Sequence, residues 1–269
     1  MTSFSGIPAL FVGHGAALFT TAKGDPTRQF LGGLSKDLER WKPKGLVVVS
    51  AHFLEAPVRV TGAQALETLH DHPAQEAYDL RYPARGSAEL SAMVVDAVRA
   101  MRWQVTVDET RGLDHGAWVP LSAMHPSASL PIVALSLHAS ESVEQHLALG
   151  RALTALRQKG ILLLGSGGAT HDQTLFRQRY FGGSPLDEVP EVSRSFDEWV
   201  GAQVTSTPGP GRSEALAKFL SHPLGRQAHP TPEHFLPLLV VAAAGEADVG
   251  QRRFTGFQHG LSTSVFQFG

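Results

Sequence analysis

Four short and almost entirely apolar runs recur along the chain and predict buried β-strands. They are IPALFVG (7–13), GLVVVSA (45–51), LPIVALSL (130–137) and ILLLGSG (161–167). Runs of this length that are rich in Val, Ile and Leu, without alternating polar residues, are typical of strands covered on both faces. The pattern therefore indicates a sheet buried between two layers.

Two segments between these runs have helical periodicity. Residues 87–102 repeat apolar side chains at three- and four-residue spacings behind Ser87, which stands in the N-cap position. Residues 142–160 begin in the same way at Ser142 and end at Gly160, where a C′ glycine belongs. Strands that alternate with helices predict an α/β fold, a layered α/β/α sandwich around a largely parallel or mixed central sheet. In such sheets, ligands bind beyond the carboxyl ends of the strands.

The 269 residues contain no repeat, low-complexity tract or long linker. The Pro/Gly-rich stretch STPGPGR (206–212) is short enough to be a surface loop. We therefore expect a single domain over residues 1–269.

Composition narrows the chemistry. The absence of cysteine excludes thiolate zinc sites, iron–sulfur clusters and a cysteine nucleophile, so any metal must bind to histidine or carboxylate. Lys plus Arg (23) nearly balance Asp plus Glu (25), which favours a small-molecule partner over nucleic acid. The N-terminal residues lack a basic, signal-like region, and the apolar runs are too short to span a bilayer. We expect a cytoplasmic protein without a membrane partner.

Three of the 13 histidines follow predicted strands. His14 lies between two glycines after the first strand, His52 follows the second, and His171 follows the strand over 161–167 across a loop of small residues. A single histidine at a strand end is more often a hydrogen-bonded structural residue than a ligand. Three at one edge of a sheet favour a metal site, because neutral imidazole is a common ligand of zinc and a good ligand of ferrous iron.

A fourth histidine lies in HPTPEHFLPLLVVAAAG (229–245). Thr231 is expected to cap a helix with Pro232 at N1, which makes His234 an N3 residue in the first turn. We therefore predict that His14, His52, His171 and His234 gather around one divalent metal ion.

Two further segments allow two interpretations each. In GLDHGAWVPL (112–121), an N-cap role for Asp114 and a functional role for the Asp114–His115 pair are about equally supported. Residues 68–87 are polar and aromatic and could line a substrate mouth, although their composition favours a solvated loop. His138 is expected to be structural. Four other histidines are expected at the surface by default: His125, His146, His222 and His259.

Taken together, PALFVGHG, VVVSAHF, LRYPA, GLDHGAW, LLGSGGATH and HPTPEHFLPLL resemble the class III extradiol ring-cleavage dioxygenases, in the 4,5-DOPA dioxygenase extradiol-like branch of the LigB superfamily. The resemblance implies a single catalytic domain with a LigB-like fold. Its reaction would open the ring of a small aromatic diol with O₂, next to the two hydroxyls rather than between them. It implies one divalent metal per chain, Fe²⁺ for activity with Zn²⁺ as the alternative, bound at His14, His52 and His234.

The same resemblance places His171 at the site, either as a further metal contact or as the acid/base, and His115 in the substrate pocket. We prefer His171 as the proton carrier, with His115 as the second choice of catalytic residue, as a hydrogen-bond partner for substrate or bound oxygen. The wider extradiol class binds its metal through two histidines and a carboxylate, whereas the third position here is a histidine. The identity of the native metal therefore stays open. The sequence also leaves open whether the chain forms a homo-oligomer.

Two other functions remain as alternatives. The first is a zinc-dependent hydrolase on the same histidines, with His171 serving a metal-activated water. The second is a binding relative that keeps the fold without turnover. An incomplete ligand set would favour the second alternative, and the sequence shows no such loss.

Overall fold

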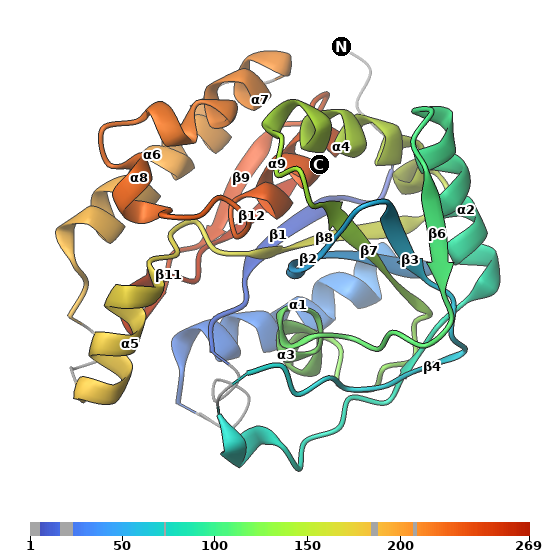
Figure 1. The fold of residues 1–269 in the computed structure, drawn as a ribbon, viewed down its shortest axis with the longest axis horizontal. Helices are drawn as coiled ribbons and strands as arrows, with labels where there is room; N and C mark the ends of the chain where they lie inside the picture. Colours follow the sequence, from blue (N-terminus) through green and yellow to red (C-terminus); the bar gives the residue numbers. More distant parts are fainter. Residues whose placement is uncertain (1–5, 17–23, 73, 184–187, 207–208) are drawn as a thin grey trace.

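The computed structural model describes residues 6–16, 24–72, 74–183, 188–206 and 209–269. An eight-stranded sheet runs through it in the order β6-β3-β7-β2-β8-β1-β12-β9 (Figure 1). Neighbouring pairs among β7, β2, β8 and β1 are parallel, whereas β12 is antiparallel to both β1 and β9, so the sheet is mixed. Its strands are β1 (Ala9–Gly13), β2 (Gly45–Glu55), β3 (Val58–Thr61), β6 (Val105–Asp108), β7 (Ile132–His138), β8 (Ile161–Gly167), β9 (Gly250–Phe254) and β12 (Val265–Phe268).

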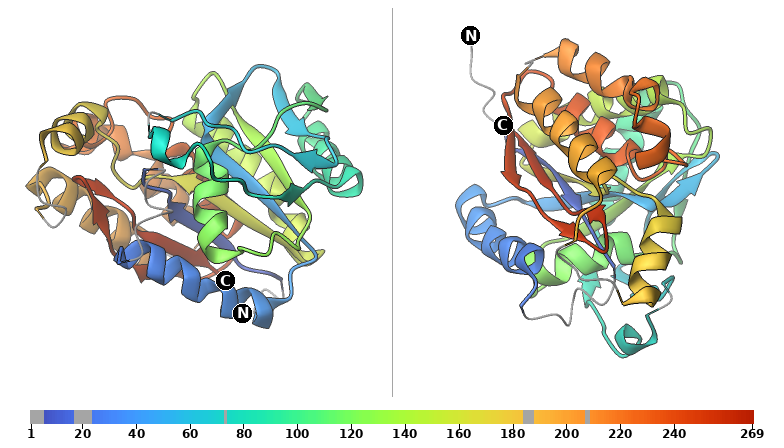
Figure 2. Two further views of the ribbon diagram at one scale, coloured as in Figure 1. Left: turned by 90° about the horizontal axis from the view of Figure 1, so that it is seen from below. Right: turned by 90° about the vertical axis from the view of Figure 1, so that its left-hand side faces the viewer.

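Helices cover both faces of this sheet, and short ribbons lie at its margins (Figure 2). The helices are α1 (Pro26–Trp41), α2 (Ala88–Ala100), α3 (His115–Met124), α4 (Val143–Gln158), α5 (Gln173–Gly182), α6 (Glu191–Ser206), α7 (Pro210–Ala217), α8 (Gly225–Ala228) and α9 (Leu236–Ala244), with 3₁₀ turns η2 (Gln75–Ala77) and η3 (Phe219–Ser221). The ribbons pair β4 (Ala65–Leu66) with β5 (Ala84–Arg85) and β10 (Phe257–Gln258) with β11 (Leu261–Ser262).

Alternation along the central strands divides the core between the two faces of the sheet. Val47 and Val49 of β2 point into one apolar cluster with α2, α4, α6 and α9, whereas Leu46 and Val48 point into the other with α1 and α3. Because successive side chains of a strand face opposite ways, an apolar run without polar interruption fills both clusters. This confirms the predicted layered α/β/α architecture.

The helix ends confirm the predicted caps. The Ser87 side chain accepts a hydrogen bond from the Leu90 N–H, and Ser142 accepts one from Gln145 N–H. Gly160 adopts a φ of +89° directly after the C-cap of α4, a conformation that favours glycine. None of the described helices is long and apolar enough to cross a bilayer.

Two sequence-based expectations about elements are wrong. The second strand does not end at residue 51 but continues as β2 to Glu55, with a register shift against β7 between Val49 and Leu54, so His52 lies within the strand. The expected surface loop over 206–212 is also wrong at its C-terminal end, because α7 begins at Pro210 and Arg212 is fully buried. The Arg212 guanidinium donates to buried carbonyls of Asp248 and Gly245, while residues 207–208 lie outside the described residues.

Candidate metal centre

A cavity of about 310 Å³ opens at the sheet edge where β1, β2 and β8 end. Five histidines from separate segments line it: His14, His52, His115, His171 and His234. His14 follows β1 directly, and His171 follows β8 across the loop 168–170. The structure thus brings all the sequence-predicted site histidines to the carboxyl edge of the sheet, where ligands bind in open α/β sheets.

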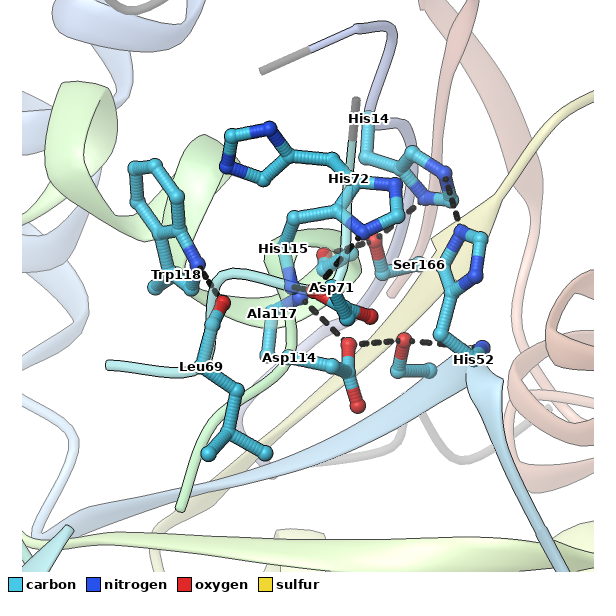
Figure 3. Close-up of polar contacts among 12 residues, drawn as sticks. His14, His52, Leu69, Asp71, His72, Asp114, His115, Ala117, Trp118 and Ser166 are labelled. Carbon is cyan, nitrogen blue, oxygen red and sulfur yellow. Dashed lines mark hydrogen bonds and ion pairs between the residues drawn. The ribbon is translucent and has the colours of Figure 1, made fainter. Parts of the chain in front are cut away.

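Three imidazole nitrogens converge within this cluster. His52 Nε2 lies 3.2 Å from His14 Nε2 and 3.2 Å from His234 Nε2 (Figure 3 shows the first contact). Two groups of metal-ligating side chains meet at this point, His14 with His52 and His115, and His171 with Glu233 and His234. His52 therefore lies at the junction of both groups.

Hydrogen bonds to Nδ1 of His14 and of His234 determine which nitrogen of each ring carries the proton. Ser166 donates its hydroxyl proton to the Gly116 carbonyl, so toward His14 Nδ1, at 3.2 Å, it accepts. Glu233 Oε1 lies 2.8 Å from His234 Nδ1 and, as a carboxylate, accepts as well. Each Nδ1 therefore carries the proton, which leaves a bare lone pair on Nε2 of His14 and of His234.

The electrostatics keep these rings uncharged. Burial, followed by the neighbouring histidines, holds the pKa of His14 and of His234 well below the ordinary value. Burial and then His115 lower the pKa of His52 in the same way. Neutral imidazoles are the form that binds a metal ion.

The His171 ring stacks on the His234 ring. The two rings stack with centroids 3.2 Å apart and an interplanar angle of 8°. His171 Nδ1 lies 3.6 Å from Glu233 Oε1, so one carboxylate lies beside both rings. Burial, His229 and His115 lower the pKa of His171 to about 3.

The predicted N-cap role of Asp114 is confirmed, and His115 lines the cavity. Asp114 is the N-cap of α3, where its Oδ1 accepts from the Ala117 N–H and from the Ser50 hydroxyl at 2.6 Å, tying the helix to β2. His115 lines the cavity, with its ring centroid 3.9 Å from that of His52. Gly116 permits this approach, because a Cβ there would overlap the Ser50 hydroxyl and press on the His52 ring.

The segment 68–87 forms part of the cavity wall, so the solvated-loop interpretation is wrong for its first half. Asp71 and His72 line the cavity. Asp71 Oδ1 accepts from the His115 main-chain N–H at 2.9 Å and lies 3.0 Å from His115 Nδ1. Although burial acts to raise the pKa of Asp71, these contacts outweigh it and hold that pKa well below the ordinary value. The segment is anchored by Trp118 Nε1, which donates to the Leu69 carbonyl at 2.9 Å.

The expected position of His234 in a first helical turn is wrong. The helix α9 begins only at Leu236, and His234 lies in the turn before it. Thr231 does not cap the helix, because its hydroxyl donates to Glu233 Oε1 at 3.0 Å. The turn is instead held against β8, where the Gly168 N–H donates to the His234 carbonyl at 3.0 Å.

Two of the four histidines expected at the surface are buried. His146 is fully buried, with Nε2 accepting from the His138 N–H at 3.1 Å and Nδ1 donating to the Ser142 carbonyl at 2.7 Å. His125 is also buried, and its Nε2 accepts from the Leu130 N–H. Both histidines form hydrogen bonds with main-chain groups outside the cavity. His138 bonds through Nδ1 to Ser140, again away from the cavity.

The helix α5 forms one wall of the cavity and was not predicted from the sequence. Gln173, Phe176, Arg177 and Tyr180 line the cavity from this helix. Their spacing of three, four and seven residues, behind Asp172 as N-cap, was the available signal. Ser166 was missed as well, since nothing in the sequence pairs it with His14.

The chain is similar to known proteins over most of its length. The family model described as the catalytic LigB subunit of aromatic ring-opening dioxygenase matches residues 8–266. The chain is 38% identical over 241 residues to a 4,5-DOPA dioxygenase extradiol of Escherichia coli K12, covering 88% of this chain and 85% of that protein. It is 35% identical over 243 residues to a 4,5-DOPA dioxygenase extradiol of Beta vulgaris, covering 88% and 86%.

A solved structure shares the fold. The crystal structure of an uncharacterised protein from Escherichia coli K12 superposes with a TM-score of 0.80 at 33% sequence identity, covering 98% of this chain and 100% of that one. The family match spans nearly the whole sheet, from the start of β1 into β12. The chain therefore belongs to the LigB family, the catalytic subunits of aromatic ring-opening dioxygenases, and is an enzyme of that class.

Proposed function

We propose that this enzyme is a metal-dependent extradiol dioxygenase that opens the ring of a catechol-type substrate with O₂. Its divalent metal is held by Nε2 of His14, His52 and His234, and the active form contains Fe²⁺. The observation that carries the proposal is the convergence of these three nitrogens, two of them fixed as bare lone pairs.

The donor set fits a metal ion. Nitrogens bound to one ion at about 2.0–2.1 Å with tetrahedral angles lie roughly 3.3–3.4 Å apart. The two Nε2–Nε2 distances of 3.2 Å agree with that spacing. Without a cation, the single proton that His52 Nε2 can carry would serve only one of its two bare neighbours, leaving buried lone pairs in contact at an energetic cost.

Supporting contacts orient these ligands. Glu233 accepts from His234 Nδ1, and Ser166 accepts from His14 Nδ1. A hydrogen bond of this kind fixes the tautomer of a ligating histidine and raises the basicity of its other nitrogen. Neutral ligands and the absence of a carboxylate ligand leave a positive centre. A ferrous ion held by His14, His52 and His234 would supply the redox chemistry that activates O₂ toward a bound catechol.

The chain itself handles protons. Burial lowers the pKa of His171 to about 3, which keeps the ring uncharged. We assign His171 the role of accepting the catechol hydroxyl proton and returning it later because its ring lines the cavity against His234. His115, oriented by Asp71, lines the cavity beside His52 and is positioned to hydrogen-bond the substrate. Phe176 and Tyr180 of α5 line the cavity as well.

Metal exchange tests this proposal. Protein purified without oxygen would be loaded with Fe²⁺ or Zn²⁺ and offered a panel of catechols in an oxygen electrode. The Fe²⁺ form should consume one O₂ per catechol and yield a coloured semialdehyde, whereas the Zn²⁺ form should bind the catechol without oxygen uptake, because zinc has no redox chemistry. Absence of uptake with every catechol, together with ester or amide hydrolysis by the Zn²⁺ form, would replace this proposal with a hydrolase.

A further inference from the structure

His72 is a buried histidine in the wall of the cavity, and its ring nitrogens have no partner. The residue is 6% exposed and is one of those that line the cavity. Within the part of the chain that the structure describes, neither Nδ1 nor Nε2 of His72 forms a hydrogen bond. A buried polar group without a partner costs free energy, so such groups are normally satisfied by protein, water or ligand. Its position in the cavity wall points to a bound molecule as that partner.

The other histidines of the cavity lining all have polar contacts. Nδ1 of His115 lies 3.0 Å from an Asp71 oxygen, and Nδ1 of His171 lies 3.6 Å from a Glu233 oxygen. The three proposed metal ligands contact one another through Nε2. Among the described lining histidines, His72 is therefore the one whose ring nitrogens form neither a hydrogen bond nor an ion pair.

Two hydrogen bonds hold the segment that carries His72. The His115 N–H donates to Asp71 Oδ1 at 2.9 Å. The Tyr78 hydroxyl donates to the His72 carbonyl at 2.8 Å. The His72 ring packs edge-on against the rings of Tyr78 and His115, with centroids 5.4 and 5.7 Å apart and interplanar angles of 77° and 73°. Figure 3 shows His72 beside Trp118 and His115, so neighbouring rings fix its orientation before a ligand binds.

His72 lies beside the part of the cavity that a substituent would reach. Among the described rings, that of His72 contacts His115 but none of the three proposed metal ligands, whereas His115 itself lies 3.9 Å from His52, centroid to centroid. A diol whose two oxygens face the proposed ligands therefore presents its ring substituent to His72, and not its reacting oxygens.

The charge state of this wall favours an uncharged group. Burial, followed by His115, lowers the pKa of His72 to about 4, although Asp71 acts in the opposite direction. A neutral imidazole carries one N–H donor and one bare nitrogen, and a hydroxyl can pair with either. The ionised Asp71 beside it disfavours an anion at this wall. The same carboxylate is engaged by the main chain and ring of His115, so an ammonium group would be buried without a free counter-charge.

We infer that His72 is a specificity-determining residue, which hydrogen-bonds an uncharged hydroxyl on the ring substituent of the aromatic diol. The diol part of this inference rests on the proposed function. An analogue without the hydroxyl would bury His72 with its nitrogens still unpaired. Sites built to hydrogen-bond a substrate hydroxyl reject analogues that lack it for this reason.

Calorimetric titration of the Zn²⁺-loaded protein tests the inference without turnover. The three ligands, 3,4-dihydroxybenzyl alcohol, 4-ethylcatechol and 3,4-dihydroxybenzylamine, have nearly the same shape and differ in the end group of the substituent. The wild type should bind the alcohol roughly 3- to 10-fold more tightly than 4-ethylcatechol, the range of a hydrogen bond between neutral groups. The amine should bind no more tightly than the alcohol.

Three variants assign the preference to His72. In His72→Phe, 4-ethylcatechol should bind at least as tightly as the alcohol. His72→Gln keeps a donor and an acceptor and should restore part of the preference. His70→Phe is the matched control, because the His70 ring also contacts Tyr78 and Trp118 but lies outside the cavity lining, and this variant should keep the full preference. Thermal unfolding of each variant checks that the fold is retained.

Nuclear magnetic resonance of ¹⁵N-histidine-labelled protein separates a direct contact from an effect of packing. The ring nitrogen signals of His72 are identified by their absence from the His72→Phe spectrum. They should move further on addition of the alcohol than on addition of 4-ethylcatechol, because only the alcohol offers a hydrogen-bonding group to the ring.

The outcomes separate this inference from the proposed function. Equal affinity of the wild type for the alcohol and 4-ethylcatechol, a preference for the alcohol that persists in His72→Phe, or tighter binding of the amine than of the alcohol would overturn the inference. Binding of the diols would in each of these cases still support the proposed function. If none of the three diols binds to the Zn²⁺-loaded protein, the proposed function and this inference fail together.

Discussion

At the scale of single residues, the site depends on which imidazole nitrogens are bare. His52 Nε2 lies 3.2 Å from Nε2 of both His14 and His234, and removal of any one of these three rings would leave a bound ion with two imidazole ligands. His52→Ala and His14→Ala should each lose most of the bound metal while the fold is retained. Metal content by mass spectrometry after gel filtration measures this loss, with His138→Ala as control because that ring bonds to Ser140 outside the cavity.

Stoichiometric metal in both His14→Ala and His52→Ala would contradict the ligand assignment. Loss of metal in the His138→Ala control would show that the assay reports general damage.

His171 allows ligation and proton transfer to be separated. If His171 carries protons, His171→Gln should keep its metal and bind a catechol, yet lose turnover by roughly two to four orders of magnitude, the usual contribution of general acid/base catalysis. The stacked position against His234, with Nδ1 3.6 Å from Glu233, is consistent with a ring beside the ligand set. Metal content and the rate constant are measured on the same sample, and a variant that loses its metal would make His171 a ligand.

At the scale of elements, the apolar strands β1, β2, β7 and β8 and the capped helices α2 and α4 could be predicted because each depends on local pattern. The apolar runs and Ser87, Ser142 and Gly160 suffice for this. The turn before α9 could not be predicted, because Thr231 bonds to Glu233 rather than to the helix. The bulge that carries His52 inside β2 depends on pairing with β7, and α5 depends on a cavity that the sequence does not display.

The close contact between β8 and the turn before α9 positions one ligand. Gly167 at the end of β8 has no side chain, and a Cβ there would overlap the His234 carbonyl oxygen. Gly167→Ala should displace the turn and weaken metal binding by about 10- to 100-fold, the range for residues that support ligands. Gly33→Ala in α1 is the matched control, because a Cβ there meets nothing within 4 Å.

Competition with a chelator measures the metal affinity of both glycine variants. Unchanged affinity in Gly167→Ala would show that His234 is positioned by other contacts.

At the scale of the whole molecule, a buried ion pair joins segments that are distant in the sequence. Arg157 Nη1 lies 2.7 Å from Asp248 Oδ2, and both side chains are almost fully buried. The same guanidinium donates to carbonyls of Ile7, Ala244 and Phe268, which ties α4 to the start of β1 and the end of β12. No local pattern in the sequence indicates this pairing. The antiparallel strands β9 and β12 escaped prediction because they are only five and four residues long and contain polar residues, GQRRF and VFQF.

Removal of one partner of the Arg157–Asp248 pair should lower the free energy of unfolding. Asp248→Ala leaves the buried Arg157 charge without its carboxylate and should lower the free energy of unfolding by about 3–5 kcal/mol. Glu246→Ala is the matched control, because it breaks the partly exposed pair with Arg151 and should cost less than about 1 kcal/mol. Denaturant unfolding compares the two, and equal costs would show that the buried pair contributes no more than the exposed one.

The most direct test of the account is the fate of the oxygen atoms. With Fe²⁺-loaded protein, a catechol and ¹⁸O₂, mass spectrometry of the ring-opened product should find both labelled atoms in it, one in the new carboxylate and one in the new aldehyde. The same reaction with Zn²⁺-loaded protein should yield no labelled product. A product with oxygen from water alone, or a ring cleaved between its hydroxyls, would contradict the assignment of this site as an extradiol dioxygenase centre.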